Sequence, residues 1–117
     1  MPVSDGYIDF VRDLLAAFEP LRFKRMFGGA GVYSNEVFFA ILVDDVLYLK
    51  VDEQTRGDYE SQGLRPLPYR KKNGRTATMS YYPVPADILE DPEALTAWTR
   101  EALEAANRAA RRSTVRR

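Results

Sequence analysis

Two apolar runs, 37–43 and 46–51, stand near the middle of the chain, and only two aspartates separate them. Both runs are rich in β-branched and aromatic residues, which suit the pleated surface of a β-strand. The run 37–43 has no polar position, so both of its faces must be covered from water. We therefore expect a central strand at 37–43, joined by a tight hairpin at Asp44-Asp45 to a second strand at 46–51.

The first part of the chain predicts an amphipathic helix over residues 5–18. Apolar side chains recur there at helical spacing, with aspartates on the opposite side. Ser4 or Asp5 can cap its first turn, and Pro20 ends it because proline lacks the backbone N–H that a helix interior needs.

A second long helix is predicted to begin at Asp91-Pro92-Glu93. This tripeptide combines a capping aspartate, a proline at the first helical position and an acid in the first turn. Apolar residues, mostly alanines, follow at helical spacing with Trp98 among them. We expect Trp98 to anchor this helix to the sheet.

The remaining segments complete the predicted order of elements. Residues 25–33 indicate one strand interrupted by glycines, which typically mark a bulge or a close approach of another backbone. Residues 53–61 indicate a short surface helix. Residues 64–72 and 75–82 flank Asn73-Gly74, a strong hairpin signal, and prolines place the first of these strands at an edge. The order α-β(3)-α-β(2)-α predicts an α+β domain with an antiparallel sheet covered by helices.

Length and composition favour one small domain without catalytic chemistry. A chain of 117 residues predicts a single domain, 1–112, followed by a frayed basic tail, 113–117. It has no cysteine and no histidine, which removes thiolate chemistry and the usual general base near neutral pH. We expect no catalytic residue, no metal and no cofactor. No signal peptide or membrane span is visible, so we expect a cytoplasmic protein that does not engage membranes.

Three motifs then occur in order: RMFGGxGxY at 25–33, FA at 39–40 with LYLKV at 47–51, and MSYY with Pro85 at 79–85. With these motifs the chain resembles the N-terminal domain of the TfoX/Sxy family, in register from about residue 5 to the last helix. The resemblance implies an α-β(3)-α-β(2)-α fold similar to that of secretion chaperones.

Members of that family are known as regulators of natural DNA uptake in bacteria, and the longer ones carry a second, helical domain. We expect this chain to lack that second domain. The resemblance then implies a regulatory or adaptor module rather than a competence activator, and it offers no established catalytic residue to carry across.

The glycines Gly28, Gly29 and Gly31 are the first candidate binding site. Exposed backbone amides in such a run can cradle an anion. The run lacks the lysine and the following helix of a phosphate-binding loop, and the spacing of the dinucleotide-binding glycines also fails. We therefore favour close packing or a bulge over nucleotide binding.

A basic and aromatic set is the second candidate. It could form a small pocket for an anion or for a partner protein, and its members are Arg25, Lys50, Tyr48, Tyr81 and Tyr82. A guanidinium with phenol hydroxyls suits the recognition of carboxylate or phosphate. The structural alternative, which we favour, is that Arg25 pairs with an acid such as Asp52 while the tyrosines fill the core.

Basic residues at the predicted hairpin tip and in the C-terminal segment are the third candidate, because they could contact phosphates. They are Arg70, Lys71, Lys72 and Arg75, followed by Arg108, Arg111, Arg112, Arg116 and Arg117. The zero net charge and the lack of a helix-turn-helix signature argue against specific nucleic-acid binding. We expect a solvated turn and a solubilising tail, with weak nucleic-acid binding as an alternative.

Taken together, these features predict a non-enzymatic regulatory or adaptor module that binds a partner protein not identified by the sequence. An exposed sheet edge would also allow a homodimer. The alternative class is a small-ligand protein or enzyme that uses the Arg25, Lys50 and Tyr82 region.

Overall fold

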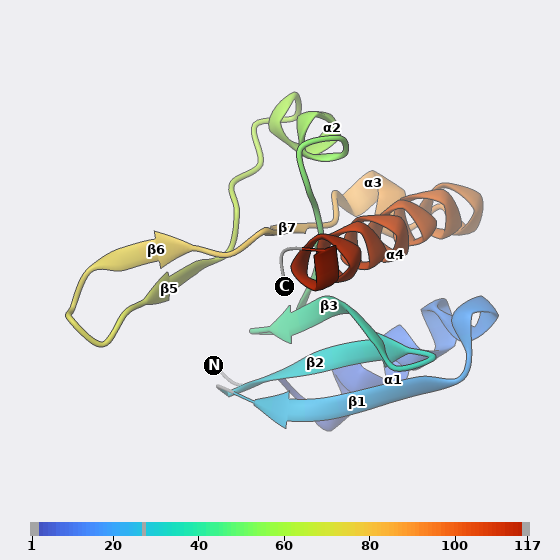
Figure 1. Ribbon diagram of the computed structural model, residues 1–117. Coiled ribbons are helices and arrows are strands. Elements are labelled where there is room, and N and C mark those ends of the chain that lie inside the picture. The colour runs from blue at the N-terminus through green and yellow to red at the C-terminus, as the bar shows by residue number, and fades with distance from the viewer. Residues whose placement is uncertain (1–2, 27, 116–117) are drawn as a thin grey trace.

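The apolar run 37–43 forms the middle strand of a five-stranded sheet in the computed structural model, which describes residues 3–26 and 28–115 (Figure 1). Side chains are described at these positions except at 69, 70 and 112–115. The helical elements are α1 (Asp5–Leu14), η1 (Ala16–Phe18), α2 (Arg56–Glu60), α3 (Ala86–Leu89) and α4 (Pro92–Val115). The strands are β1 (Leu21–Met26), β2 (Gly29–Ser34), β3 (Val37–Val43), β4 (Val46–Lys50), β5 (Pro68–Arg70), β6 (Thr76–Thr78) and β7 (Tyr81–Pro83).

All strand pairs are antiparallel, and the order in the main sheet is β1-β2-β3-β4-β7. Strands β5 and β6 pair only with each other, as a separate two-stranded sheet. The predicted α+β class is confirmed. The observed order has more strands than the predicted α-β(3)-α-β(2)-α order, because four strands precede α2 and three follow it.

The prediction of one interrupted strand over 25–33 is wrong. Gly28 adopts a φ of +77°, a left-handed conformation that costs glycine little, and the chain reverses there. Strands β1 and β2 therefore pair along their length, from Leu21 opposite Ser34 to Met26 opposite Gly29. A bulge was expected among the glycines. The structure has an irregularity of this kind between β2 and β3, where the pairing register shifts after Val32.

Two tight turns connect β2 to β3 and β3 to β4. Their central residues, Asn35-Glu36 and Asp44-Asp45, all have positive φ, which matches the right-handed twist of the strands that they join. The hairpin predicted at Asp44-Asp45 is confirmed. Its second aspartate also accepts hydrogen bonds from the backbone N–H and the hydroxyl of Ser4, at 2.9 and 3.2 Å, which tie the start of α1 to this turn.

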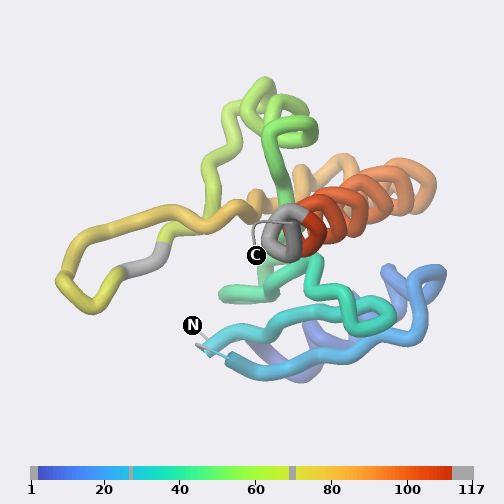
Figure 2. The backbone as a smooth tube through the Cα atoms, in the orientation of Figure 1, coloured from blue at the N-terminus to red at the C-terminus, as the bar shows by residue number. Residues whose placement is uncertain are grey.

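The segment predicted as a strand over 75–82 divides into two strands that belong to different sheets. Its first part, β6, pairs with β5, and its last part, β7, joins the main sheet beside β4. The β5–β6 hairpin, which we call the ribbon, extends away from the rest of the molecule (Figure 2). The edge strand predicted over 64–72 is thus reduced to β5, whose only strand partner is β6.

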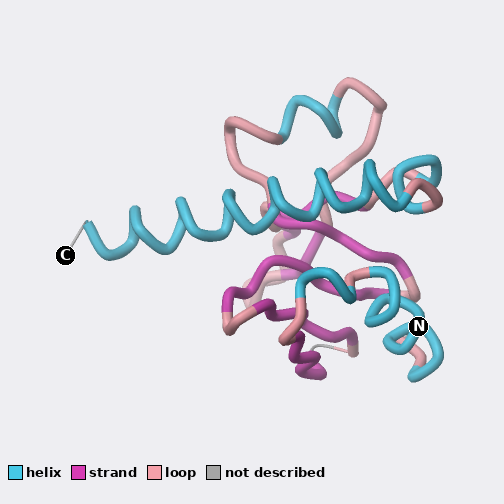
Figure 3. The backbone as a smooth tube through the Cα atoms, turned by 90° about the vertical axis from the view of Figure 1, so that its right-hand side faces the viewer, coloured by secondary structure: helices cyan, strands magenta, loops and turns pink. Residues whose placement is uncertain are grey.

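Helices α1 and α4 cover one face of the main sheet, which we call the helical face. The core on this face consists of inward side chains from both helices and from β2, β3 and β4, among them Val11, Leu15, Val32, Leu42, Leu47, Leu49, Leu95 and Ala102. Helix α4 runs along the sheet and continues beyond it toward the C-terminus (Figure 3). No helix in the described part of the chain combines the length and apolar character that a membrane crossing requires.

The predicted start of α4 is confirmed, since the Asp91 carboxylate accepts from the backbone N–H groups of Glu93 and Ala94. Trp98 is partly exposed and packs against the core of the helical face. Its ring meets that of Tyr59 edge-on, with centroids 4.6 Å apart, and so fastens α2 to α4. Helix α4 extends to Val115, while residues 116 and 117 of the predicted tail lie outside the described residues.

A largely buried ion pair fixes α4 against the connection from β4 to α2. Arg108 donates through Nε and Nη2 to both carboxylate oxygens of Asp52, at 2.6 and 3.1 Å. The two side chains are only 21% and 12% exposed. Asp52 also accepts from the backbone N–H of Gln54 at 3.0 Å. Hydrogen bonds from Arg108, above all, hold the pKa of the Asp52 carboxyl below its ordinary value.

We predict that Asp52→Asn lowers the free energy of unfolding by about 2 kcal/mol at neutral pH, because it leaves the Arg108 charge unpaired. A depressed folded-state pKa contributes stability above the unfolded value of about 4, and that contribution disappears as the pH falls through the folded value. The difference from wild type should therefore shrink below about pH 4. Urea denaturation from neutral to acid pH measures it, and Asp13→Asn, at an exposed position, is the control. An equal loss of unfolding free energy in both variants would contradict a stabilising role for the Asp52–Arg108 ion pair.

We also predict that Gly29→Ala destabilises the fold more than Gly31→Ala. A Cβ at Gly29 would lie 2.2 Å from the backbone oxygen of Leu42, so the strands themselves would have to move. A Cβ at Gly31 would meet the ends of the Met26 and Phe38 side chains, at 2.7 and 2.9 Å, and these can rotate away. We expect the loss at Gly29 to exceed about 2 kcal/mol. Chemical denaturation of the two variants decides the order, and the reverse order would refute this packing account.

Candidate functional site

The second face of the main sheet, which we call the open face, carries a cluster to which no described helix contributes. Its buried members are Ile41 and Tyr81 of the sheet and Leu67 from the segment before β5. Phe38, Val43, Tyr48 and Met79 pack around them and are partly exposed. The apolar side chains of this face are thus covered in part by the base of the ribbon and remain in part open to solvent.

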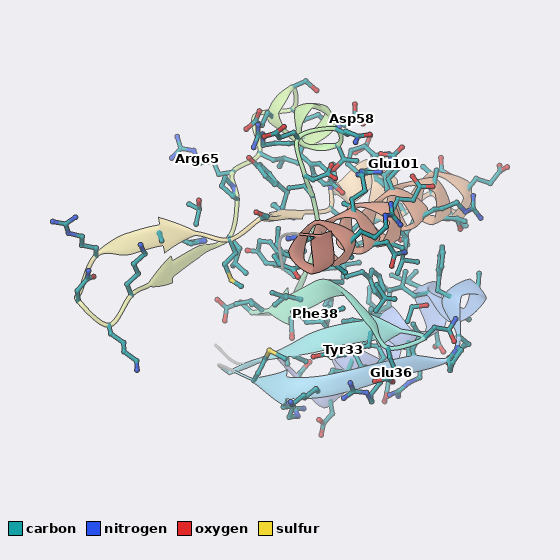
Figure 4. All side chains as sticks on the ribbon, viewed as in Figure 1. Tyr33, Glu36, Phe38, Asp58, Arg65 and Glu101 are labelled. Carbon is teal, nitrogen blue, oxygen red and sulfur yellow. The ribbon has the colours of Figure 1, made fainter. Side chains whose placement is uncertain are left out.

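Aromatic rings form a continuous row across the open face, with a cation at each end. The Arg22 guanidinium lies 4.1 Å from the centre of the Tyr33 ring. Tyr33 stacks on Phe38 at 5.0 Å between centroids, and Phe38 meets Tyr81 at 5.8 Å. The Lys50 ammonium lies 5.2 Å from the centre of the Tyr81 ring. Figure 4 shows Tyr33 and Phe38 on the neighbouring strands β2 and β3. These contacts hold the rings in one arrangement.

Gly31 makes this row possible. Its missing side chain leaves the space that the Phe38 ring and the end of Met26 occupy against the backbone of β2. Gly28 provides the turn between β1 and β2, and Gly29 lies against the backbone of β3. The three glycines of the predicted anion cradle therefore have separate geometric roles, of the kind that the packing alternative proposed.

The predicted pocket of Arg25, Lys50 and the tyrosines does not assemble as one site. Lys50, Tyr48 and Tyr81 lie on the open face, since Lys50 is opposite Tyr81 in the β4–β7 register. Tyr82 is the next residue, so its side chain points to the helical face. There its hydroxyl donates to Glu60 at 2.9 Å, and its ring packs on Tyr59.

Arg25 lies on β1, at the far edge of the sheet from β7. Its guanidinium pairs with the carboxylate of Asp5 and donates to the backbone oxygen of Val3 at 3.2 Å. Arg25 pairs with an acid, as the structural alternative proposed, but the acid is Asp5, because Arg108 engages Asp52. Arg25 thus holds the N-terminal segment against β1 and does not share a site with Lys50.

The electrostatics of the open face suit recognition better than proton transfer. Burial raises the pKa of the Tyr81 phenol to about 12. Burial, with the negative charge of Asp44, also raises the pKa of Tyr48. Both phenols therefore stay protonated at neutral pH and act as hydrogen-bonding groups. Among the described residues, no set of acidic side chains gathers in a geometry that could hold a metal ion.

A hollow of about 100 Å³ lies on the helical side of β7, between the start of α2 and the base of the ribbon. Asp52, Arg56, Ser80 and Tyr82 are among the residues that line it. Ligand pockets usually enclose roughly 300–1,000 Å³, so this hollow is too small for a nucleotide or a comparable metabolite.

Two features of the surface were not predicted from the sequence. Arg22, Tyr33 and Phe38 complete the aromatic row, and only the register of β1, β2 and β3 brings them together. Asp58 of α2 and Glu101 of α4 lie close together (Figure 4). Burial and the charge of Asp58 raise the pKa of the Glu101 carboxyl. Residues so far apart in sequence leave no local signal of such a pair.

The predicted nucleic-acid residues are distributed over two places. Lys71, Lys72 and Arg75 are exposed at the tip of the ribbon, while Arg111 is exposed on α4. Arg108 is committed to Asp52. The side chains of Arg70, Arg112, Arg116 and Arg117 lie outside the described residues.

Comparison with known proteins supports the resemblance carried by the motifs. The chain is 27% identical over 81 residues to the DNA transformation protein TfoX1 of Aliivibrio fischeri, an alignment that covers 69% of this chain and 38% of that relative. The chain therefore spans well under half of the relative's length. Residues 13–106 match the TfoX N-terminal domain, which is most of the chain. The chain belongs to the TfoX N-terminal domain family.

Proposed function

We propose that this chain is a non-enzymatic regulatory module that acts by binding a partner protein in the bacterial cytoplasm. The observation that carries the proposal is the aromatic row on the open face, from Arg22 through Tyr33 and Phe38 to Tyr81 and Lys50. Competence regulation is the process in which we expect it to act, since its relative in Aliivibrio fischeri is named a DNA transformation protein.

The composition of the open face favours a protein partner. Aromatic residues and arginine are enriched in the centres of protein interfaces, where they provide most of the binding energy. Because the rings already stack on one another, binding orders few side chains and costs little conformational entropy. At the edge of this face, Val46 is one of the few large apolar side chains exposed among the described residues, next to the partly exposed Val43 and Tyr48.

The enzymatic and small-ligand alternatives have less support. Acid–base catalysis near neutral pH needs a group that titrates there, and the chain has no histidine, while burial raises the pKa of the Tyr81 phenol to about 12. The pocket proposed for a small ligand required Arg25, Lys50 and Tyr82 together, and these lie on separate parts of the sheet.

A homodimer through the free edge of the sheet stays a prediction. Strand β1 is the free edge, and Arg22, Lys24 and Arg25 lie on it. Antiparallel pairing of two β1 strands would bring these like charges together, and such edge cations oppose strand pairing between copies. We therefore expect the open face to contribute more to binding than this edge.

We predict that a photoreactive phenylalanine analogue at Phe38 crosslinks the full chain to a specific protein in the source cell. Phe38 stands in the middle of the aromatic row, so a partner on the open face must come close to it. The same analogue at Ala97, which is exposed on α4, is the matched control. Mass spectrometry of the crosslinked products identifies the partner.

The proposal requires a product at position 38 that is absent at position 97 and absent when Tyr33→Asp disrupts the row. Circular dichroism establishes that both labelled chains and the variant are folded. A crosslink at position 97 with none at position 38 would place the interface on the helices and contradict the proposal.

A further inference from the structure

The ribbon is attached to the body only at its base. Backbone hydrogen bonds of 2.8 Å from Leu67 N–H to the Tyr81 oxygen and from Met79 N–H to the Leu67 oxygen join it to β7. Leu67 is buried against Ile41 and Tyr81 in the open-face cluster. Beyond this base, β5 and β6 have only each other as strand partners and extend away from the rest of the molecule (Figures 1 and 2).

Little of the ribbon beyond its base is buried. Pro68, Thr76 and Thr78 are exposed, and Ala77 is only partly buried. A two-stranded hairpin without a covering layer is marginally stable in water, so the ribbon adds little to the stability of the fold. The stability of the fold therefore does not determine which residues the ribbon contains.

The ribbon and its flanks have an excess of positive charge. The whole chain has a formal net charge of zero, yet the segment 64–82 has no acidic residue and contains Arg65, Arg70, Lys71, Lys72 and Arg75. The side chains of Lys71, Lys72 and Arg75 are exposed. None of them forms an ion pair with a described residue. Unpaired like charges at one tip repel one another, and a polyanion would relieve that repulsion.

The tip holds these cations in a defined loop. Lys71 N–H donates to the Arg75 oxygen at 2.8 Å, and Gly74 N–H donates to the Lys71 oxygen at 3.0 Å. The Asn73 side chain accepts from the Arg75 N–H at 2.9 Å, and Gly74 takes a φ of +87°. The backbone of the tip is thus preorganised, which lowers the entropy cost of binding there.

We propose that the ribbon binds the phosphate backbone of duplex DNA, without dependence on base sequence. A two-stranded β-ribbon fits the major groove of B-DNA. Lysine, arginine and threonine side chains are common phosphate ligands, and the exposed hydroxyls of Thr76 and Thr78 lie two residues apart on β6, on the same side of the ribbon. The ribbon is separate from the aromatic row, so this inference does not depend on the proposed protein-binding function.

Fluorescence anisotropy of a labelled duplex of about 20 base pairs, roughly two helical turns, tests the proposal on the full chain. We expect binding at low salt that weakens steeply toward physiological ionic strength of about 0.15 M. The variant Lys71→Gln/Lys72→Gln/Arg75→Gln should weaken binding at low salt at least about tenfold. It should also reduce the slope of log affinity against log salt by about 0.9 for each phosphate that the variant no longer neutralises.

The matched control is Lys24→Gln/Arg100→Gln/Arg111→Gln, which removes the same charge from exposed positions on β1 and α4. It should bind the duplex within about twofold of wild type. Thermal unfolding by circular dichroism should be unchanged in the ribbon variant, because the ribbon is not part of the core.

Three results would overturn the proposal. The first is no binding at low salt. The second is an equal loss in both variants, which would indicate attraction by overall charge. The third is displacement of the labelled duplex by poly-glutamate as efficiently as by unlabelled duplex at the same concentration of charge. That result would indicate that the ribbon recognises acidic protein segments.

Discussion

The constraint on which this fold depends is the cover that the apolar strand β3 needs on both faces. Two different kinds of cover meet this need, and the second leaves Phe38 and Val43 partly exposed. Helices α1 and α4 cover one face through a core of mostly aliphatic side chains, with Phe39 and Tyr82 among them. The other face has Leu67 and Met79 from the base of the ribbon and a row of aromatic rings that cover one another. The two faces therefore differ in chemistry as well as in exposure.

That asymmetry connects the fold with the proposed function. The sheet residues of the helical face are covered by helices, whereas the open face has partly exposed rings and two cations in a fixed arrangement. Two adjacent residues of β3 illustrate the division. Phe39, at the register shift, is fully buried in the helical core, while Phe38 belongs to the partly exposed aromatic row.

Local signals in the sequence predicted the local features of the fold and none of its long-range pairings. The turn at Asp44-Asp45 and the capped start of α4 at Asp91 depend on neighbouring residues alone, and both are confirmed. The turn at Gly28 was missed because glycine permits a bulge and a reversal equally well. The candidate site failed for a similar reason: whether Tyr81 or Tyr82 faces Lys50 depends on the β4–β7 register, which the sequence does not reveal.

The two faces of β3 differ in access: the helical face is closed, and the aromatic face is available to a partner. Hydroxyl-radical footprinting of the free protein tests this difference directly on neighbouring rings of the same chemical type. We expect Phe38 to be oxidised readily and Phe39 to be protected until the protein unfolds. Equal oxidation of the two rings, or protection of Phe38 with oxidation of Phe39, would contradict it.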